Sequence, residues 1–221
     1  MYSIAIDGPS GVGKSSLAKK VAKNFGIIYV DTGALYRCIG LYCVQNGIDS
    51  TDPQEVENVL GKITIDLKYL NGEQRVYLNS IDVSDKIRET EVDAPTSNSS
   101  SVPAVREFLR DLQQNIAKEN SVIMDGRDIG TVILPNADVK IFITADAKER
   151  AKRRYDQLIR HGIQADYDKT LKNIIIRDEN DINRKISPLK AADDAIIIDT
   201  TDNTKEKTLE IVTSIIRSKL K

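Results

Sequence analysis

The stretch Gly8-Pro9-Ser10-Gly11-Val12-Gly13-Lys14-Ser15 decides the fold of this chain. It matches the pattern G-x-x-x-x-G-K-[S/T] of the phosphate-binding loop, or P-loop. The apolar run at residues 2–7 predicts a buried strand before it, and apolar residues at helical spacing over 17–25 predict a helix after it. A P-loop joins a strand to a helix in this way, and the alternative is a glycine-rich turn that fits the pattern by chance.

The chemistry of the loop follows from this geometry. Its glycines let backbone N–H groups point inward, and the helix N-terminus adds partial positive charge. Lys14 is placed to reach the β- and γ-phosphates of a nucleoside triphosphate, and the Ser15 hydroxyl to bind Mg²⁺. We therefore expect a nucleoside triphosphate and Mg²⁺ to bind here, and the resemblance described below implies that the triphosphate is ATP. The expected ATP-binding residues are Gly8, Pro9, Ser10, Gly11, Val12, Gly13, Lys14, Ser15 and Ser16.

Composition limits the remaining function classes. The 221 residues are 40% hydrophobic and 29% charged, with a net charge of −1, which predicts a globular chain without a general attraction to nucleic acid or anionic membrane. Cys38 and Cys43 are expected to be free core thiols. No apolar run approaches the ~20 residues of a membrane span, and the N-terminus leads into a strand and not an export signal. We expect a cytoplasmic monomer.

Alternating elements predict the architecture. Short apolar strands at 27–30, 121–125, 139–143 and 195–199 alternate with helical patterns, which favours a parallel sheet with helices on both faces. The alternating runs 63–67 and 75–78 flank Asn71-Gly72 and predict an antiparallel hairpin. We expect one α/β domain of the P-loop NTPase class over 1–221, made of a core (1–60, 90–145, 190–221), an antiparallel β insert on the acceptor side (63–89), and a helical lid with acceptor-binding helices (146–187).

Positive charge gathers in the predicted lid. Residues 145–190 hold twelve of the 32 Lys and Arg residues against eight acids. Arg150, Arg153 and Arg154 lie within about one helical turn, so at least two can face a common target. They could stabilise the transferring phosphoryl group and help to exclude water, or they could form a solvated face. Arg154 is assigned to the catalytic set.

Other arginines fit an acceptor that carries a phosphate. Arg37 follows a turn signal and Arg127 follows a predicted strand, so both are expected at the ligand-binding edge of the sheet. Arg177, Asp181 and Arg184 are spaced i, i+4, i+7 and share one helix face. That face could bind substrate or form an intrahelical ion-pair ladder. The polar residues 96–101 could likewise be a flexible linker or a binding segment that presents hydroxyl groups.

Two longer motifs carry a resemblance that covers nearly the whole chain. Asp31-Thr32-Gly33-Ala34-Leu35-Tyr36-Arg37 and Gly126-Arg127-Asp128-Ile129-Gly130-Thr131-Val132 resemble bacterial-type cytidylate kinases, a family of nucleoside monophosphate kinases. The predicted β insert is similar to the extra antiparallel sheet of that family. The resemblance implies a phosphotransferase of pyrimidine nucleotide metabolism that converts CMP and dCMP to CDP and dCDP with ATP.

The resemblance also implies roles for single residues. Arg37, Arg127 and Arg184 are expected to bind the CMP phosphate, Arg177 and Asp181 the sugar hydroxyl, and Ser97, Arg106 and Asp128 the cytosine. Thr32 stands where the family often has serine and joins the CMP-binding set. The implied catalytic set is Lys14, Arg127, Arg184 and Arg154. A carboxylate suits this base because Asp128 can accept a hydrogen bond from the cytosine amino group, where uracil presents a carbonyl.

Two other functions stay open at this stage. The nearer one is a P-loop kinase for UMP, dTMP or shikimate, which an assay with several acceptors would identify. The farther one is a nucleotide switch, which would need a guanine-reading N-K-x-D motif. No such motif occurs, because Asn203-Thr204-Lys205 does not fit the pattern.

Overall fold

The computed structural model describes residues 1–70 and 73–220. The chain forms two compact units. The first unit contains Met1–Tyr29 and Asn120–Lys221, and the second contains Val30–Glu119.

A parallel sheet confirms the predicted fold class, and all of its strands except the second half of β2 belong to the first unit. Its strand order is β2-β6-β1-β7-β8. The bounds are Ile28–Asp31 for β2, Val122–Gly126 for β6, Ser3–Asp7 for β1, Val139–Thr144 for β7 and Ile196–Asp199 for β8. Because β1 pairs in parallel with both β6 and β7, its carboxyl end lies beside theirs. The loop after β1 therefore starts at the ligand-binding edge of the sheet.

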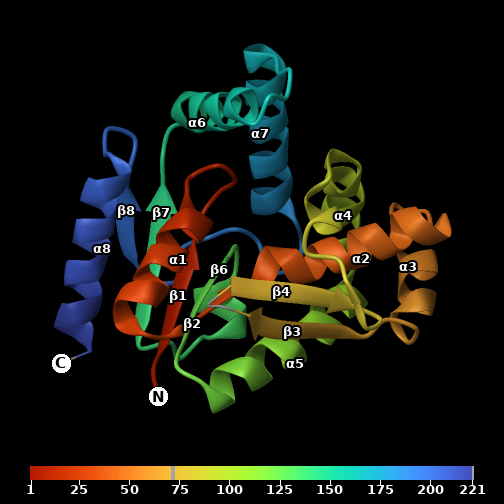
Figure 1. Ribbon diagram of the computed structural model, residues 1–221, viewed down its shortest axis with the longest axis horizontal. Helices are drawn as coiled ribbons and strands as arrows, with labels where there is room; N and C mark the ends of the chain where they lie inside the picture. The colour runs from red at the N-terminus through yellow and green to blue at the C-terminus, as the bar shows by residue number, and fades with distance from the viewer. Residues whose placement is uncertain (71–72, 221) are drawn as a thin grey trace. The chain divides into compact units, whose positions relative to one another are not determined.

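Helices pack on this sheet through apolar faces. The helices of the first unit are α1 (Lys14–Phe25), the π-helix η3 (Ile129–Ile133), α6 (Ala147–Arg160), α7 (Tyr167–Asn183) and α8 (Lys205–Lys219). Val21 of α1 and Val212 and Ile216 of α8 are fully buried in one cluster with Ile4 and Ile141 of the sheet. In Figure 1, α1 and α8 lie side by side against the strands. None of the helices in the described ranges is long and apolar enough to cross a bilayer.

The second unit combines helices with a small antiparallel sheet. Its elements are α2 (Thr32–Asn46), α3 (Pro53–Leu60), β3 (Ile65–Leu70), β4 (Glu73–Leu78), β5 (Ile81–Asp82), the short helices η1 (Lys86–Arg88) and η2 (Thr90–Val92), α4 (Asp93–Ser99) and α5 (Pro103–Glu119). The strands pair in the order β3-β4-β5, which confirms the predicted β insert. The turn predicted at Asn71-Gly72 lies outside the described residues.

Helix α2 is buried along most of its length. Its N-terminus is capped by Asp31, whose carboxylate accepts a hydrogen bond from Ala34 N at 3.1 Å. At Gly40 the backbone of α4 approaches so closely that a Cβ atom would lie 2.8 Å from Thr96 N. Cys38 and Cys43 on this helix are free and buried, as predicted, and burial raises the pKa of Cys38 to about 12.

Candidate functional site

The backbone of the P-loop depends on glycine at fixed positions. Gly8, Gly11 and Gly13 have φ angles of +149°, +76° and +101°, a region that side chains with a Cβ rarely adopt. A Cβ on Gly8 would also collide with the carbonyl oxygen of Ile143 on β7. The glycines predicted from the motif are therefore required by the conformation that the loop adopts.

Lys14 is the first residue of α1, and its side chain is buried at the loop. Its Nζ donates a hydrogen bond to Pro9 O at 2.7 Å. Burial, followed by repulsion from Arg127, lowers the pKa of Lys14 well below its ordinary value, while Asp125, Asp7 and Asp181 oppose this shift. The structure thus places the predicted phosphate-binding lysine close to residues predicted for the acceptor.

Ser15 and Asp125 form the pair of oxygen ligands that would suit Mg²⁺. Ser15 Oγ donates to Asp125 Oδ2 at 2.8 Å, and Tyr29 Oη donates to Asp125 Oδ1 at 2.8 Å. Mg²⁺ prefers oxygen ligands and usually binds through one or two protein groups together with substrate phosphates and water. The described residues contain no group of three or more His, Cys, Asp or Glu suited to a metal ion. A hydroxyl and one carboxylate are oxygen ligands of the kind that bind Mg²⁺ together with substrate phosphates.

Asp125 is a candidate that the sequence prediction missed. It lies at the end of the apolar strand β6, opposite Ile6 of β1 in the parallel register. An aspartate that ends a buried strand is a visible sequence signal, but its meaning depends on β6 lying next to β1.

A cluster of arginines and aspartates lies in the same unit. Arg127 Nε is 2.7 Å from Asp181 Oδ2, and Arg184 lies 3.8 Å both from Asp181 Oδ1 and from Asp128 Oδ1. Burial alone would raise the pKa of Asp181, but Arg127, Arg177 and Arg184 outweigh it and hold that pKa below its ordinary value. Asp181 on α7 pairs with Arg184, the residue that follows the helix, and it also contacts Arg127 from another element, so an intrahelical ladder alone does not describe this face.

The three lid arginines differ in their surroundings. Arg150 is buried, and its guanidinium donates to Ser10 O in the P-loop at 3.0 Å and pairs with Asp178 on α7. Arg153 donates to Thr200 O at 2.6 Å. Arg154 is exposed and donates to Gln157 on its own helix at 3.2 Å. A purely solvated face therefore does not describe all three, and a phosphate target shared by at least two of them stays a prediction.

The second unit gathers other predicted acceptor residues around α2 and α4. Arg37 forms an ion pair with Asp93 at the start of α4. Arg106 is buried, donates to Ser100 O at 3.0 Å and lies with its guanidinium 5.4 Å from the centre of the Tyr36 ring. Ser97 is half-buried on α4, between Asp93 and Ser100 in the sequence. The polar stretch 96–101 is therefore part of a packed helical segment and not a flexible linker.

The turn before α2 is held by side chains that the sequence prediction did not include. Asp31 N donates to Gln74 Oε1 on β4 at 2.9 Å, and Arg88 Nη2 lies 2.5 Å from Asp31 Oδ2. Thr32, a predicted CMP ligand, is buried as the first residue of α2. The β insert thus contacts the turn that carries a predicted acceptor residue.

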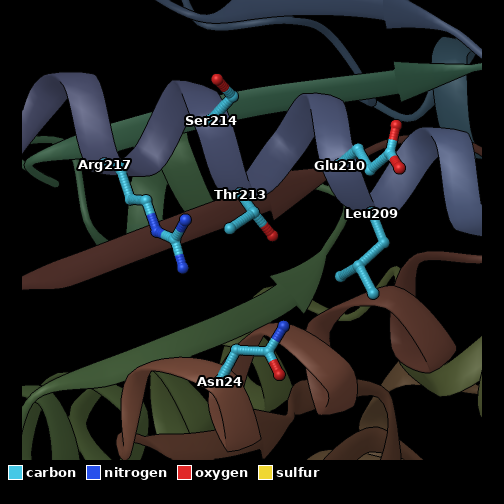
Figure 2. Close-up of a pocket in the computed structure, with 6 residues that line it drawn as sticks. All are labelled: Asn24, Leu209, Glu210, Thr213, Ser214 and Arg217. Atoms are coloured by element: carbon cyan, nitrogen blue, oxygen red, sulfur yellow. The ribbon is translucent and has the colours of Figure 1, made fainter.

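A separate pocket of about 380 Å³ lies between α1 and α8 (Figure 2). Its lining side chains are Asn24, Leu209, Glu210, Thr213, Ser214 and Arg217. Asn24 is close to the C-terminal end of α1, whereas Lys14 begins that helix. The pocket contains none of the residues predicted to bind substrate and is distinct from the P-loop.

These features define a class of protein. A P-loop follows the central strand of a parallel sheet, and its buried lysine lies near an arginine–aspartate cluster that can bind phosphate. This combination characterises the P-loop phosphotransferases.

The comparisons with known proteins identify the family. The family model described as "Cytidylate kinase" matches residues 4–218. The chain is 47% identical to the cytidylate kinase of Caldicellulosiruptor bescii, over 95% of this chain and 93% of that protein. It is 46% identical to that of Fusobacterium nucleatum (95% and 94% covered) and 45% identical to that of Lactobacillus johnsonii (100% and 96% covered). The chain belongs to the cytidylate kinase family.

A solved structure supports the fold at much lower sequence identity. An uncharacterized protein from Eubacterium ventriosum is similar with a TM-score of 0.53 at 15% identity, covering 98% of both chains. At this identity the likeness bears on the fold alone.

Proposed function

We propose that this chain transfers the γ-phosphoryl group of ATP to CMP and dCMP, with ADP and CDP or dCDP as products. One observation carries the chemistry of the proposal. The first unit gathers Lys14 of the donor loop with Arg127 and Asp181, residues predicted for the acceptor. Family membership supports the choice of CMP as the acceptor.

In the proposed step, a phosphate oxygen of CMP attacks the γ-phosphorus of ATP. A new P–O bond forms, and the bond from the γ-phosphorus to the bridging oxygen breaks, so ADP leaves with that oxygen. The attacking phosphate has its second pKa near 6 and is largely ionised at neutral pH, so no strong general base is needed. Catalysis then rests on positioning and on stabilising charge, roles that we assign to Lys14, Arg127 and Arg184.

The Ser15 hydroxyl and the Asp125 carboxylate would hold Mg²⁺, which, when bound, supplies Lewis-acid stabilisation of phosphate charge. The protein residues keep their own tasks. The P-loop N–H groups and Lys14 orient the triphosphate. Arg154, which is exposed on α6, is proposed to contact the phosphates during transfer.

Acceptor binding is divided among three groups of residues. Arg37, Arg127 and Arg184 bind the CMP phosphate, and Arg177 and Asp181 bind the sugar hydroxyl. Thr32, five residues before Arg37 in the sequence, is included among the CMP contacts. Cytosine is read by Ser97, Arg106 and Asp128.

The carboxylate of Asp128 is the residue on which base selection depends. It is only 5% exposed. A buried carboxylate that accepts from the cytosine amino group would face the carbonyl of uracil without a proton between them. Because the unpaired groups stay buried, we expect UMP to be used about 100-fold less efficiently than CMP, judged by kcat/KM.

Replacing this carboxylate tests the proposal. Asp128→Asn is expected to lower kcat/KM for CMP by roughly 10- to 100-fold, while the Kd of ATP measured by calorimetry stays near the wild-type value. Asp138→Asn is the matched control, since Asp138 is also in the first unit but holds Ser3 N at the start of β1. An equal loss of CMP use and ATP binding would contradict the role of Asp128.

We further infer that the enzyme acts as a monomer in the cytoplasm. This part of the proposal rests on the sequence, and light scattering after size-exclusion chromatography tests the monomer.

A further inference from the structure

One buried carboxylate, that of Asp7, connects the start of the P-loop to the segment that follows Arg127 and Asp128. Asp7 is the last residue of β1 and directly precedes Gly8, the first residue of the P-loop. Its Oδ1 accepts a hydrogen bond from Ile129 N at 2.8 Å, and its Oδ2 accepts one from Gly130 N at 2.7 Å. Those two N–H groups follow Arg127 and Asp128 in the chain.

The surroundings of Asp7 make this arrangement specific. Gly130 has no side chain, and a Cβ there would lie 3.4 Å from Asp7 Oδ2 and 3.2 Å from Lys140 Cδ. Asp7 is also the register partner of Gly126, the residue before Arg127. The strand pairing and the two side-chain hydrogen bonds thus hold both ends of the segment that carries Arg127 and Asp128.

We propose that Asp7 is a positioning residue that fixes the Arg127–Asp128 segment relative to the P-loop, so that the acceptor is aligned with the γ-phosphate. The alignment of the two substrates rests on the proposed function. The contact of Asp7 with the backbone of Ile129 and Gly130 does not, because the hydrogen bonds show it directly.

A second observation supports a functional reason for this carboxylate. Asp7 is 4% exposed, and burial raises its pKa to about 6, against the opposing effects of the two N–H donors and of Lys14. The negative charge of Asp128 acts in the same direction as burial and is part of this rise. A buried carboxylate that is ionised at neutral pH lowers stability, so its presence here is better explained by the two backbone groups that it orders than by stability.

Asparagine at position 7 offers a conservative test. The amide has the same shape but only one acceptor oxygen, so its NH₂ group would face one of the two N–H donors. Asp7→Ala removes both acceptors. Asp138→Asn is the control, because Asp138 accepts from Ser3 N at the other end of the same strand at 2.7 Å.

Hydrogen exchange, CMP kinetics and ATP binding are measured on each variant of the 221-residue chain. Hydrogen exchange of residues 126–134 without ligands reports on the contact whatever the acceptor is. The kinetics give kcat and KM for CMP at saturating ATP, with the Kd of ATP measured separately. We expect Asp7→Asn to speed exchange in 126–134 and to lower kcat/KM for CMP by roughly 10- to 100-fold, with less than about a threefold change in ATP Kd. The control should match the wild type.

The outcomes separate this inference from the proposed function. Faster hydrogen exchange in residues 126–134, together with a lower kcat/KM for CMP and an unchanged Kd of ATP, supports the role of Asp7. Unchanged exchange in 126–134, or an equal loss of ATP binding and CMP use, overturns it. If wild-type protein does not phosphorylate CMP, the proposed function fails, while the exchange measurement still decides whether Asp7 orders the Arg127–Asp128 segment.

Discussion

The buried ion pair between α6 and α7 predicts a large loss of stability when its arginine is replaced. Arg150 Nη2 lies 2.6 Å from Asp178 Oδ2, and the two side chains are 6% and 14% exposed. Arg150 also donates to Ala145 O at 2.9 Å and to Ser10 O at 3.0 Å. Arg150→Met keeps most of the aliphatic stem and removes all of these donors.

The size of this loss in unfolding free energy depends on Asp178, which would stay buried without its partner. Among the described residues Asp178 Oδ1 has no hydrogen-bond partner, so no second group there would replace the guanidinium. Breaking a buried pair by removing one charge costs about 3–5 kcal/mol, because the other charge stays buried. We expect Arg150→Met to lower the free energy of unfolding by about 4 kcal/mol. It should also raise the KM for ATP, since Ser10 lies in the P-loop.

Urea unfolding of the ligand-free protein at pH 7 measures this loss. Arg153→Met on the same helix is the control. Its side chain is 25% exposed, so we expect a loss below about 1.5 kcal/mol. The double variant Arg150→Met/Asp178→Leu removes both charges and should recover much of the stability. A loss under about 1 kcal/mol for Arg150→Met, or strict additivity in the double variant, would refute this reasoning.

Three further predictions concern single residues. Lys14→Ala should lower kcat by at least about 100-fold in phosphoryl-transfer assays without lowering the melting temperature, because the wild-type fold already buries this ammonium unfavourably; near-normal turnover would contradict its role. Gly40→Ala should cost about 1–3 kcal/mol in urea unfolding and raise the KM for CMP, because the new Cβ would push against Thr96 N on the helix that carries Ser97. The folded-state pKa of Asp7 is about 6 against 3.8 for the unfolded chain, so its contribution is fully present below about pH 4 and is lost as the pH rises through 6. The stability of Asp7→Asn relative to wild type should therefore increase by ~3 kcal/mol from pH 4 to pH 7 in urea unfolding, and a pH-independent difference would show that this shift is absent.

The P-loop, the parallel sheet and the β insert could be predicted because their signals are local. Gly8 to Ser15 specify a loop conformation within eight residues, and alternating apolar runs specify strands. Asp7 and Asp125 also end predicted strands, but nothing local shows that their carboxylates meet Gly130 N and Ser15 Oγ. Those contacts depend on β1 lying between β6 and β7.

The arginines of the predicted lid are a second case in which the sequence alone does not predict the contacts. The sequence places Arg150, Arg153 and Arg154 within one turn and cannot tell them apart by spacing. In the structure the first is buried against Asp178, and the third is exposed. Burial depends on how α6 packs on α7 and on the P-loop, and this information is not contained in a charge pattern.

The central claim is that this chain is a phosphotransferase that selects cytosine nucleotides through a buried carboxylate. The most direct test measures ADP formation by the wild-type protein with ATP, Mg²⁺ and, in turn, CMP, dCMP, UMP and AMP. We predict that turnover depends on the acceptor and that CMP and dCMP are used. We also predict that kcat/KM for UMP and for AMP is at least about 100-fold lower than kcat/KM for CMP. Equal use of UMP and CMP, or ATP hydrolysis that does not depend on any acceptor, would contradict the claim.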